Sequence, residues 1–292
     1  MELTLRHQST IAQPVSVSGF GFWSGLDVTI EFRPAAANQG LVFVRRDLPA
    51  HPRIAANILN RIPGPRRTTL VHGGNSVEMV EHVLAALAGL QIDNCEIHID
   101  AAEMPGMDGS SQSFVSALQS VGRVLQDARQ PVLRVLKPIR VTEGQAWIQA
   151  IPLNQHLLKL NYQLEYSHAP SIGSQSFATL VSPDVFAIQI APARTFLLDS
   201  EASELKQQGI GSRVSFDDVL VFSEQGPIQN RLRFDNECAR HKALDMIGDF
   251  ALAGGDLIGE FTASKSGHLL NSKMVTAVLQ QNIHSLSNRQ SA

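Results

Sequence analysis

The strongest pattern in the sequence lies in Asn236-Glu-Cys-Ala-Arg-His-Lys-Ala-Leu-Asp-Met-Ile-Gly-Asp-Phe-Ala-Leu-Ala253. Its apolar residues recur at helical spacing, so that Ala243, Met246 and Phe250 share one side of a predicted helix. Gly254-Gly255 is expected to end this helix, because glycine is favoured just past helix C-termini. A strand is predicted next, at 257–263, and then a second helix at about 269–281. The C-terminal part therefore has the order helix, strand, helix.

The N-terminal half shows the same order of elements. Short alternating runs broken by Gly, Pro and Asn, such as Val28-Thr-Ile-Glu-Phe-Arg-Pro34, are typical of half-buried antiparallel strands. Because each half has strands followed by helix, strand and helix, we infer an internal duplication of an α+β unit. The remaining predicted elements are strands between 4 and 44, a helix at about 76–89 that ends at Gly89, a strand at 95–100, a helix at about 110–125, and strands at 146–151 and 156–165.

A chain of 292 residues is expected to form about two domains. The polar stretch Asp127-Ala-Arg-Gln-Pro131 is predicted to be the linker between them. The expected domains are 1–127 and 131–292. The fold class is expected to be α+β, with two similar domains, each a β-sheet layered with helices.

The composition excludes several classes of protein. Only 17% of the residues are charged, and 24 basic residues stand against 27 acidic ones, so no nucleic-acid partner is expected. No apolar run approaches the roughly 18 residues of a membrane span, and no signal peptide is recognised, so we expect a soluble protein without a transmembrane segment. Two isolated cysteines, Cys95 and Cys238, favour a reducing compartment and hence a cytoplasmic location.

The first candidate for chemistry lies on the polar side of the 236–253 helix. His241 and Asp245 are four residues apart, with Asp249 one turn further, so an imidazole and a carboxylate can converge on one point. Catalytic zinc sites use three protein ligands, and this pair would supply two of them. The alternative interpretation is an exposed His/Asp pair that adds little to stability.

Glu81-His82 is the second candidate, because His82 projects away from the apolar stripe of its own predicted helix. The imidazole could meet His241 and Asp245 between the two halves, and Glu81 could accept a proton from water. A solvated Glu-His pair on a helix surface is the alternative.

Two further stretches combine polar side chains with a strand end. In Ser264-Lys-Ser-Gly-His-Leu-Leu270, Lys265 and His268 lie in a turn before a helix, and His268 could be a general acid or only an ordinary turn histidine. Arg194-Thr-Phe196 alone indicates no more than the start of a strand.

The glycine-rich Gly19-Phe-Gly-Phe-Trp-Ser-Gly25 lacks the features of a phosphate-binding loop and is predicted to be a tight connection between strands.

The chain resembles the zinc-dependent UDP-3-O-acyl-N-acetylglucosamine deacetylases of lipid A synthesis, from about Val15 to Leu279. No single fragment is specific for this family, but the number of matching fragments and their order are highly specific. The fragments are Arg33-Pro-Ala-Ala-Ala-Asn-Gln-Gly40, Val80-Glu-His-Val-Leu-Ala-Ala-Leu-Ala-Gly-Leu90, Ile92-Asp-Asn94, Glu103-Met-Pro-Gly-Met-Asp-Gly-Ser110, Ala193-Arg-Thr-Phe196, Leu232-Arg-Phe-Asp235, the stretch 240–249, and Lys265-Ser-Gly-His268.

The resemblance implies two α+β domains with the active site in the cleft between them. It implies a metal-dependent amide hydrolase that removes acetate from a UDP-linked acylated amino sugar. The metal ligands would be His82, His241 and Asp245, and Zn²⁺ is the expected ion, although Fe²⁺ would accept the same ligands.

The resemblance also assigns roles to the other candidates. Glu81 would be the general base, His268 the cationic group that helps the amine to leave, and Asp249 the residue that orients or tunes it. Thr195 would stabilise the oxyanion. Lys242 and Lys265 are similar to family residues near the sugar and diphosphate, and Phe196 is similar to one that packs against the sugar.

The sequence departs from the family pattern at two places. Trp23 stands where the family usually has His, and Arg213-Val214 stand where it commonly has two glycines. These departures motivate an alternative, a catalytically silent homologue that binds a nucleotide sugar or an acyl chain. A zinc amidohydrolase for another N-acylated sugar or acyl length is a further alternative. A monomer is expected.

Overall fold

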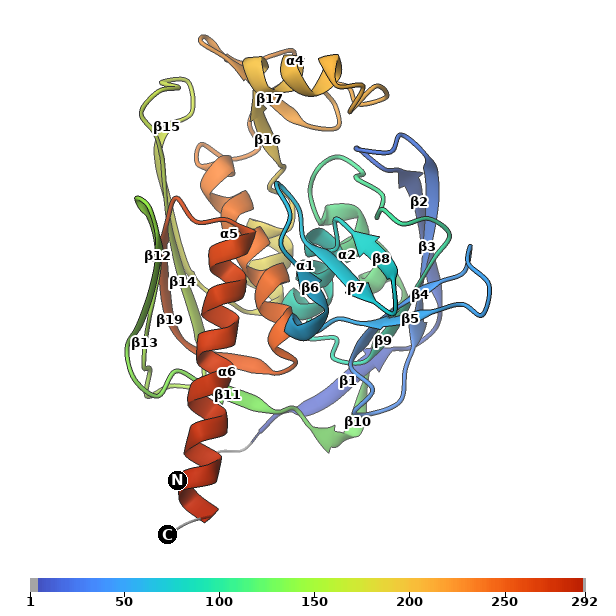
Figure 1. Ribbon diagram of the computed structural model, residues 1–292, viewed down its shortest axis with the longest axis vertical. Helices are drawn as coiled ribbons and strands as arrows, with labels where there is room; N and C mark the ends of the chain where they lie inside the picture. Colours follow the sequence, from blue (N-terminus) through green and yellow to red (C-terminus); the bar gives the residue numbers. More distant parts are fainter. Residues whose placement is uncertain (1–4, 291–292) are drawn as a thin grey trace.

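The computed structural model describes residues 5–290, with side chains up to residue 283, and two β-sheets form its outer layers (Figure 1). The first half builds a five-stranded sheet in which the last strand, β9, lies between β3 and β4. It runs antiparallel to β3 and parallel to β4. Across the sheet the strands are β2 (Val15–Phe20), β3 (Asp27–Pro34), β9 (Cys95–Ile99), β4 (Leu41–Arg45) and β5 (Arg53–Ala55).

The second half repeats this topology in a six-stranded sheet. Its last strand, β19, lies between β13 and β14, antiparallel to the former and parallel to the latter. The repeated strand order confirms the expected α+β class with two similar units. The strands are β12 (Ile139–Glu143), β13 (Ala146–Ile151), β19 (Asp256–Ser264), β14 (Leu158–Tyr166) and β15 (Gly173–Leu180), with β11 (Val132–Arg134) beside β19.

Helices fill the space between the two sheets (Figure 1). In each unit one helix precedes the last strand and one follows it. The helices that precede the last strands, α1 and α5, pack against each other at the centre of the molecule. The first unit has α1 (Glu81–Gly89) and α2 (Gln112–Val121), and the second has α5 (Glu237–Phe250), continued by a 3-10 turn at Ala251–Ala253, and α6 (His268–Gln290).

Gly248 allows α1 and α5 to approach each other through their backbones. A Cβ atom at this position would lie only 2.1 Å from the carbonyl oxygen of Glu81, so a larger residue would push the helices apart. Residues on every side of α1 are buried, including Val83, Leu84 and Leu87. The contact therefore holds the polar residues of two units together inside the protein.

Each unit carries an insertion at the same topological position, between the outermost strand and the first helix. Within these insertions the sequence patterns indicated only the strand start at Arg194–Phe196, because most of the elements are short. The first contains a 3-10 turn (Ile58–Asn60), β6 (Arg61–Ile62), β7 (Thr69–His72) and β8 (Asn75–Glu78). The second contains α3 (Pro183–Val185), a π-helical turn (Phe186–Ile190), β16 (Phe196–Leu198), α4 (Asp199–Gln207), β17 (Leu220–Ser223) and β18 (Gly226–Pro227).

The segment predicted as a linker is mostly a strand. β10 (Arg123–Arg129) pairs with β1 (His7–Ile11), so these backbone groups make ladder hydrogen bonds. Beside this ribbon, the guanidinium of Arg6 binds Asp93 of the first unit and Asp256 of the second, with nitrogen–oxygen distances of 2.6 to 2.7 Å. The junction between the halves is therefore ordered, and the domain boundaries stay a prediction.

Three predicted helix boundaries were wrong. The helix placed at 76–89 begins only at Glu81, because residues 75–78 pair with β7, and Gly89 ends it as predicted. The helix placed at 110–125 ends at Val121, where Gly122 has a φ of 76°, and the chain continues into β10. The last helix extends to Gln290. Within residues 5–290, no helix is long and apolar enough to cross a membrane.

Candidate active site

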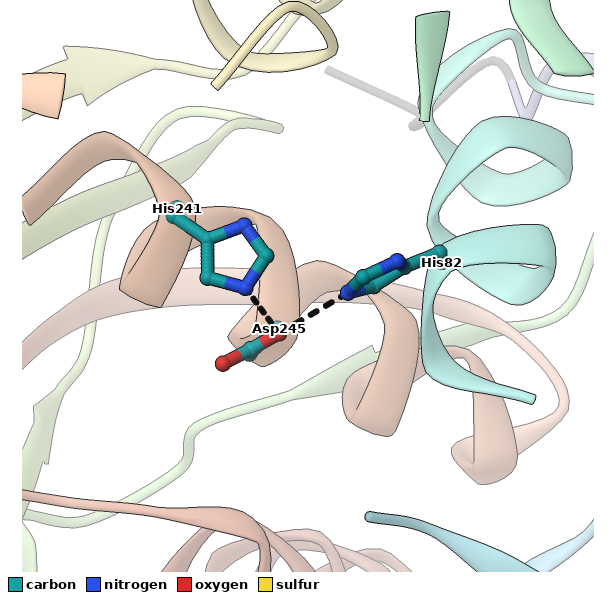
Figure 2. A group of neighbouring side chains, drawn as sticks. All are labelled: His82, His241 and Asp245. Atoms are coloured by element: carbon teal, nitrogen blue, oxygen red, sulfur yellow. Dashed lines mark ion pairs between the residues drawn. The ribbon is translucent and has the colours of Figure 1, made fainter. Parts of the chain in front are cut away.

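His82 of α1 meets His241 and Asp245 of α5 at the contact between the two helices (Figure 2). A nitrogen of each imidazole and one carboxylate oxygen lie within 4.8 Å of one another. Nε2 of His241 is 3.4 Å from Oδ1 of Asp245, and Nε2 of His82 is 3.8 Å from the same oxygen. All three side chains are buried, which rules out the exposed pairs considered as alternatives.

The protonation states of this cluster fit a divalent metal ion. Burial, with the nearby His241, lowers the pKa of His82 to about 3, and burial also lowers the pKa of His241. Burial opposes ionisation of Asp245, but the ammonium of Lys242 and the neighbouring imidazoles together outweigh it and hold the pKa of this carboxyl well below its usual range. Nδ1 of His241 donates to the carbonyl oxygen of Ala193 at 3.0 Å, which leaves Nε2 as the ligand atom. Two neutral imidazoles and one carboxylate are a suitable donor set.

Glu81, the residue before His82, lies within reach of the same space. Burial is the main reason that its pKa is raised to about 7, and the carboxylates of Asp249 and Asp245 add to the increase while His268 opposes it. Its Oε2 accepts a hydrogen bond from the backbone N–H of Thr68 at 2.9 Å. Its Oε1 lies 3.9 Å from Nε2 of His268. A carboxylate with a pKa near neutrality can exchange protons at neutral pH.

His268, at the start of α6, is held by Asp249 of α5. Its Nδ1 lies 2.8 Å from Oδ2 of Asp249, which also accepts from the side-chain amide of Asn271 at 2.7 Å. The hydroxyl of Thr68 donates to the other carboxylate oxygen at 2.5 Å. Burial alone would lower the pKa of His268, but the charge and hydrogen bond of Asp249 raise it to about 9. His268 is therefore a cation at neutral pH, and it is more than an ordinary turn histidine.

The loop before His268 is held in a specific backbone conformation. Lys265 has a φ of 53°, which is uncommon for a residue with a side chain. The hydroxyl of Tyr162 donates to the carbonyl oxygen of Ser266 at 2.6 Å. Strained backbone of this kind persists where surrounding contacts fix it, and it is enriched at functional sites.

Thr195 approaches the site from the second insertion. Its backbone N–H donates to the carbonyl oxygen of Gly109 at 2.8 Å, which fixes it against the first unit. Gly109 has a φ of 77°, and a Cβ there would lie 2.6 Å from the carbonyl oxygen of Asp218, so only glycine fits. The ring of Phe196 meets the imidazole of His241 edge to face, with centroids 6.4 Å apart.

Two lysines bring positive charge to the site. Nζ of Lys242 lies 2.7 Å from Oδ2 of Asp245, and this carboxylate raises the pKa of Lys242 although burial opposes it. Lys265 pairs with Glu165 at 2.9 Å and is more exposed. Both lysines can attract an anionic group.

A cavity of about 890 Å³ connects these residues. Both units contribute to its wall, and the second insertion contributes an apolar part, which includes Leu205, Ile210 and Phe216. Asp249 is absent from the lining and contacts His268 instead. The residues expected from the sequence that line the cavity are Glu81, His82, Thr195, Phe196, His241, Lys242, Asp245, Lys265 and His268.

Residues 8–280 match the family model described as UDP-3-O-acyl N-acetylglycosamine deacetylase. The chain belongs to this deacetylase family. It is similar to the UDP-3-O-acyl-N-acetylglucosamine deacetylase of Actinobacillus succinogenes, with 40% identity over 94% of this chain and 90% of the relative. The enzyme of the same name from Thermosynechococcus vestitus is 39% identical over 94% of this chain and 95% of the relative. The enzyme of the same name from Syntrophotalea carbinolica is 36% identical over 94% of this chain and 88% of the relative.

Membership of the deacetylase family confirms the resemblance seen in the sequence. Deacetylases hydrolyse amides, so the expected enzyme class is confirmed as well. The family consists of metalloenzymes, and the His82, His241 and Asp245 cluster could hold the metal ion.

Trp23 gives this deacetylase an aromatic surface on the cavity wall. Its backbone N–H and that of Ser24 donate to the two carboxylate oxygens of Glu103, both at 2.8 Å. The guanidinium of Arg67 stacks over the Trp23 ring at 4.2 Å from the centroid. The turn predicted between two strands is therefore built around a buried carboxylate.

Arg213, the second departure from the family pattern, connects the two halves of the deacetylase. Its Nη1 donates to the carbonyl oxygen of Gly25 at 2.7 Å and lies 2.8 Å from a carboxylate oxygen of Asp27. Its guanidinium also stacks over Phe20, 4.5 Å from the ring centroid. Val214, the next residue, lines the cavity. The second insertion is thus tied to the turn that carries Trp23.

Sequence reasoning missed the residues that support the site. Thr68 and Asn271 both hold Asp249, and Ala193 orients His241 through its carbonyl oxygen. Thr68 lies in an insertion with little periodicity, and a backbone carbonyl leaves no signal in the sequence. Asn271, one turn after His268 in a predicted helix, could have been considered because of its spacing.

Proposed function

We propose that this chain hydrolyses the N-acetyl group of UDP-3-O-acyl-N-acetylglucosamine, and so catalyses the committed step of lipid A biosynthesis. The products are UDP-3-O-acyl-glucosamine and acetate. The observation that supports this most strongly is one cavity in which the buried cluster of His82, His241 and Asp245 faces Glu81 and His268. The active site then lies in the cleft between the two units. The family membership supports the substrate.

His82, His241 and Asp245 would hold the metal ion, for which we propose Zn²⁺. Two imidazoles and one carboxylate suit zinc, although Fe²⁺ accepts the same ligands. When bound, the ion supplies Lewis acidity, which polarises an amide carbonyl and makes water more acidic.

Glu81 is proposed as the general base. Its pKa of about 7 allows the carboxylate to take a proton from water as the hydroxyl oxygen adds to the acetyl carbon. The side-chain hydroxyl of Thr195 would donate a hydrogen bond to the oxygen that becomes negatively charged. One well-placed donor of this kind stabilises the transition state by about 3 kcal/mol.

His268 is proposed as the general acid. As the carbon–nitrogen bond breaks, the amine nitrogen takes a proton from the imidazolium, and acetate and the free amine are released. Its pKa of about 9 keeps it charged at neutral pH. Asp249 holds Nδ1 at 2.8 Å, so that Nε2, 3.9 Å from a Glu81 oxygen, faces the reaction.

The remaining lining residues fit the other parts of this substrate. Lys242 and Lys265 would attract the diphosphate, and Phe196 would pack against the sugar. The apolar wall from the second insertion would accommodate the acyl chain. We further propose that the enzyme acts in the cytoplasm as a monomer, and the location agrees with two free, buried cysteines.

A deacetylation assay with the UDP-3-O-acyl substrate, with zinc quantified in the same sample, tests this function. We expect acetate release with one zinc per chain. A panel of acyl-chain lengths compared by kcat/KM would define the preferred substrate. Zinc-replete protein that binds the substrate but releases no acetate would instead support the silent homologue, an alternative disfavoured by the complete set of proposed catalytic residues.

A further inference from the structure

Arg194 and Glu237 form a buried ion pair beside the site, and no role in the proposed reaction accounts for it. The side chain of Glu237 is fully buried, and Arg194 is 5% exposed. Nε of Arg194 lies 2.8 Å from Oε1 of Glu237, and its Nη2 lies 3.2 Å from Oε2. The backbone N–H of Arg194 also donates to Oε1, at 3.1 Å.

The remaining polar atoms of this pair are satisfied as well. Arg194 donates from Nη1 to Oδ1 of Asn230 at 2.9 Å, and from Nη2 to the carbonyl oxygen of Arg231 at 2.7 Å. Oε2 of Glu237 accepts from the backbone N–H of Arg233 at 2.6 Å. A buried ion pair adds little to net stability compared with apolar residues of similar size, so such a complete network calls for another explanation.

The pair joins two segments that carry the proposed chemistry. Glu237 is the first residue of α5, one turn before His241 and two turns before Asp245. Arg194 lies between Ala193, whose carbonyl oxygen accepts from Nδ1 of His241 at 3.0 Å, and Thr195. The ion pair therefore fixes the register of the 193–195 segment against the helix that holds two metal ligands.

We infer that Arg194 and Glu237 are positioning residues, which hold the Ala193 carbonyl against His241 and the Thr195 hydroxyl toward the reacting carbonyl. The part of this inference that concerns Thr195 rests on the proposed function. The part that concerns the metal cluster does not. Rotation of the 193–195 segment would free Nδ1 of His241, so its ring orientation and tautomer would no longer be fixed. It would also move the Thr195 donor, and small displacements at such a position reduce turnover strongly.

Arg194→Lys and Glu237→Gln test this inference. Each keeps the approximate size of the side chain but removes the paired geometry of guanidinium and carboxylate. In folded protein we expect kcat to fall about tenfold or more, with KM changed less than about twofold. The affinity of metal-free protein for Zn²⁺ alone, measured by competition with a chelating dye, should fall about tenfold or more.

A double-mutant cycle with Thr195→Ala separates positioning from a general loss of structure. If Arg194 acts through Thr195, then Arg194→Lys should reduce kcat much less in the Thr195→Ala background than in the wild type. Arg45→Lys is the control, because Arg45 is another buried arginine in an ion pair, with the more exposed Asp47 at 2.6 Å, and it does not line the cavity. It should lower stability but leave kcat and the Zn²⁺ affinity unchanged.

Asn230→Ala provides the test if both ion-pair variants fail to fold. It keeps the pair and removes one acceptor from Arg194, so we expect kcat to fall about two- to fivefold at unchanged KM. Folded variants with wild-type kcat, wild-type Zn²⁺ affinity or fully additive effects with Thr195→Ala would overturn the inference. A wild-type enzyme that releases no acetate would instead overturn the proposed function, and the Zn²⁺ measurement would still test the role at His241.

Discussion

Asp249 holds the imidazole of His268 at 2.8 Å, so one buried carboxylate determines the charge of the group that faces Glu81. Asp249 lies on α5, whereas His268 begins α6 and Glu81 begins α1. The carboxylate and its partners therefore come from different elements and meet only in the folded chain. Burial would otherwise favour the neutral imidazole.

The pH dependence of kcat/KM should be bell-shaped. Activity should rise as Glu81 loses its proton, at or below a pKa of about 7, because a bound cation lowers this pKa further. It should fall as His268 loses its proton, at or below a pKa of about 9, because the same cation also disfavours the charged imidazole. Asp249→Asn removes the anion that keeps His268 charged, so the alkaline limb should move to lower pH and turnover at pH 8 should fall roughly tenfold or more. An NMR titration of His268 gives its pKa independently, and an unmoved alkaline limb would contradict the assignment.

Gly248→Ala should separate the two helices that carry the metal cluster. The new Cβ would be placed 2.1 Å from the backbone of Glu81, which no side-chain rotation can relieve. We expect a loss of about 1 to 3 kcal/mol in the free energy of unfolding, together with weaker Zn²⁺ binding. Urea denaturation and dye competition measure these two quantities. Gln119→Ala, at an exposed position of α2, is the control and should change neither.

Arg6→Ala should destabilise the junction between the halves. Arg6 pairs with Asp93 and Asp256 at 2.6 Å each, and its removal leaves two partly buried carboxylates without their partner. The expected loss in unfolding free energy is about 2 kcal/mol. Arg33→Ala removes a more exposed pair with Glu31 and should cost less than about 0.5 kcal/mol. Equal losses in the two variants, measured by urea denaturation, would contradict this role for Arg6.

Arg213→Ala should affect substrate binding more than turnover. The change releases the second insertion from Gly25 and Asp27, so the cavity wall near Val214 becomes less ordered. We expect KM for the acylated substrate to rise roughly 2- to 10-fold, with kcat nearly unchanged. Arg140→Ala is the control, because Arg140 also stacks on an aromatic ring, that of Trp147, and neither residue lines the cavity. A fall in kcat at constant KM would argue against this role.

The sequence predicted the parts of the fold that have a strong periodicity. The α5 stretch was long, regular and ended by Gly254, so its position and its polar side were predicted correctly. The start of α1 was predicted too early. Residues 75–78 form a strand, but Val80 and Val83 just after them fit a helix, so the predicted helix was extended over the strand. β10 was missed, because its only strand partner is β1, more than a hundred residues away in the sequence.

The side chains of the candidate site could be predicted from the sequence. The contacts that support these side chains could not be predicted. Local spacing placed His241 and Asp245 together, because helix geometry fixes that distance. The meeting of His82 with this pair depends on the approach of α1 to α5 at Gly248. The support of Asp249 by Thr68 depends on an insertion without a regular pattern. Tertiary packing determines such contacts.

We propose that Glu81 takes the proton from water at a metal-dependent deacetylase site. The most direct test is acetate release from UDP-3-O-acyl-N-acetylglucosamine by wild-type and Glu81→Gln protein, with zinc content and folding measured in the same samples. Because the amide is neutral and of the same size, the variant should keep one zinc per chain and its fold. Its kcat should fall by about 10²- to 10⁴-fold. Folded, zinc-replete Glu81→Gln protein that releases acetate at the wild-type rate would show that Glu81 is not the general base.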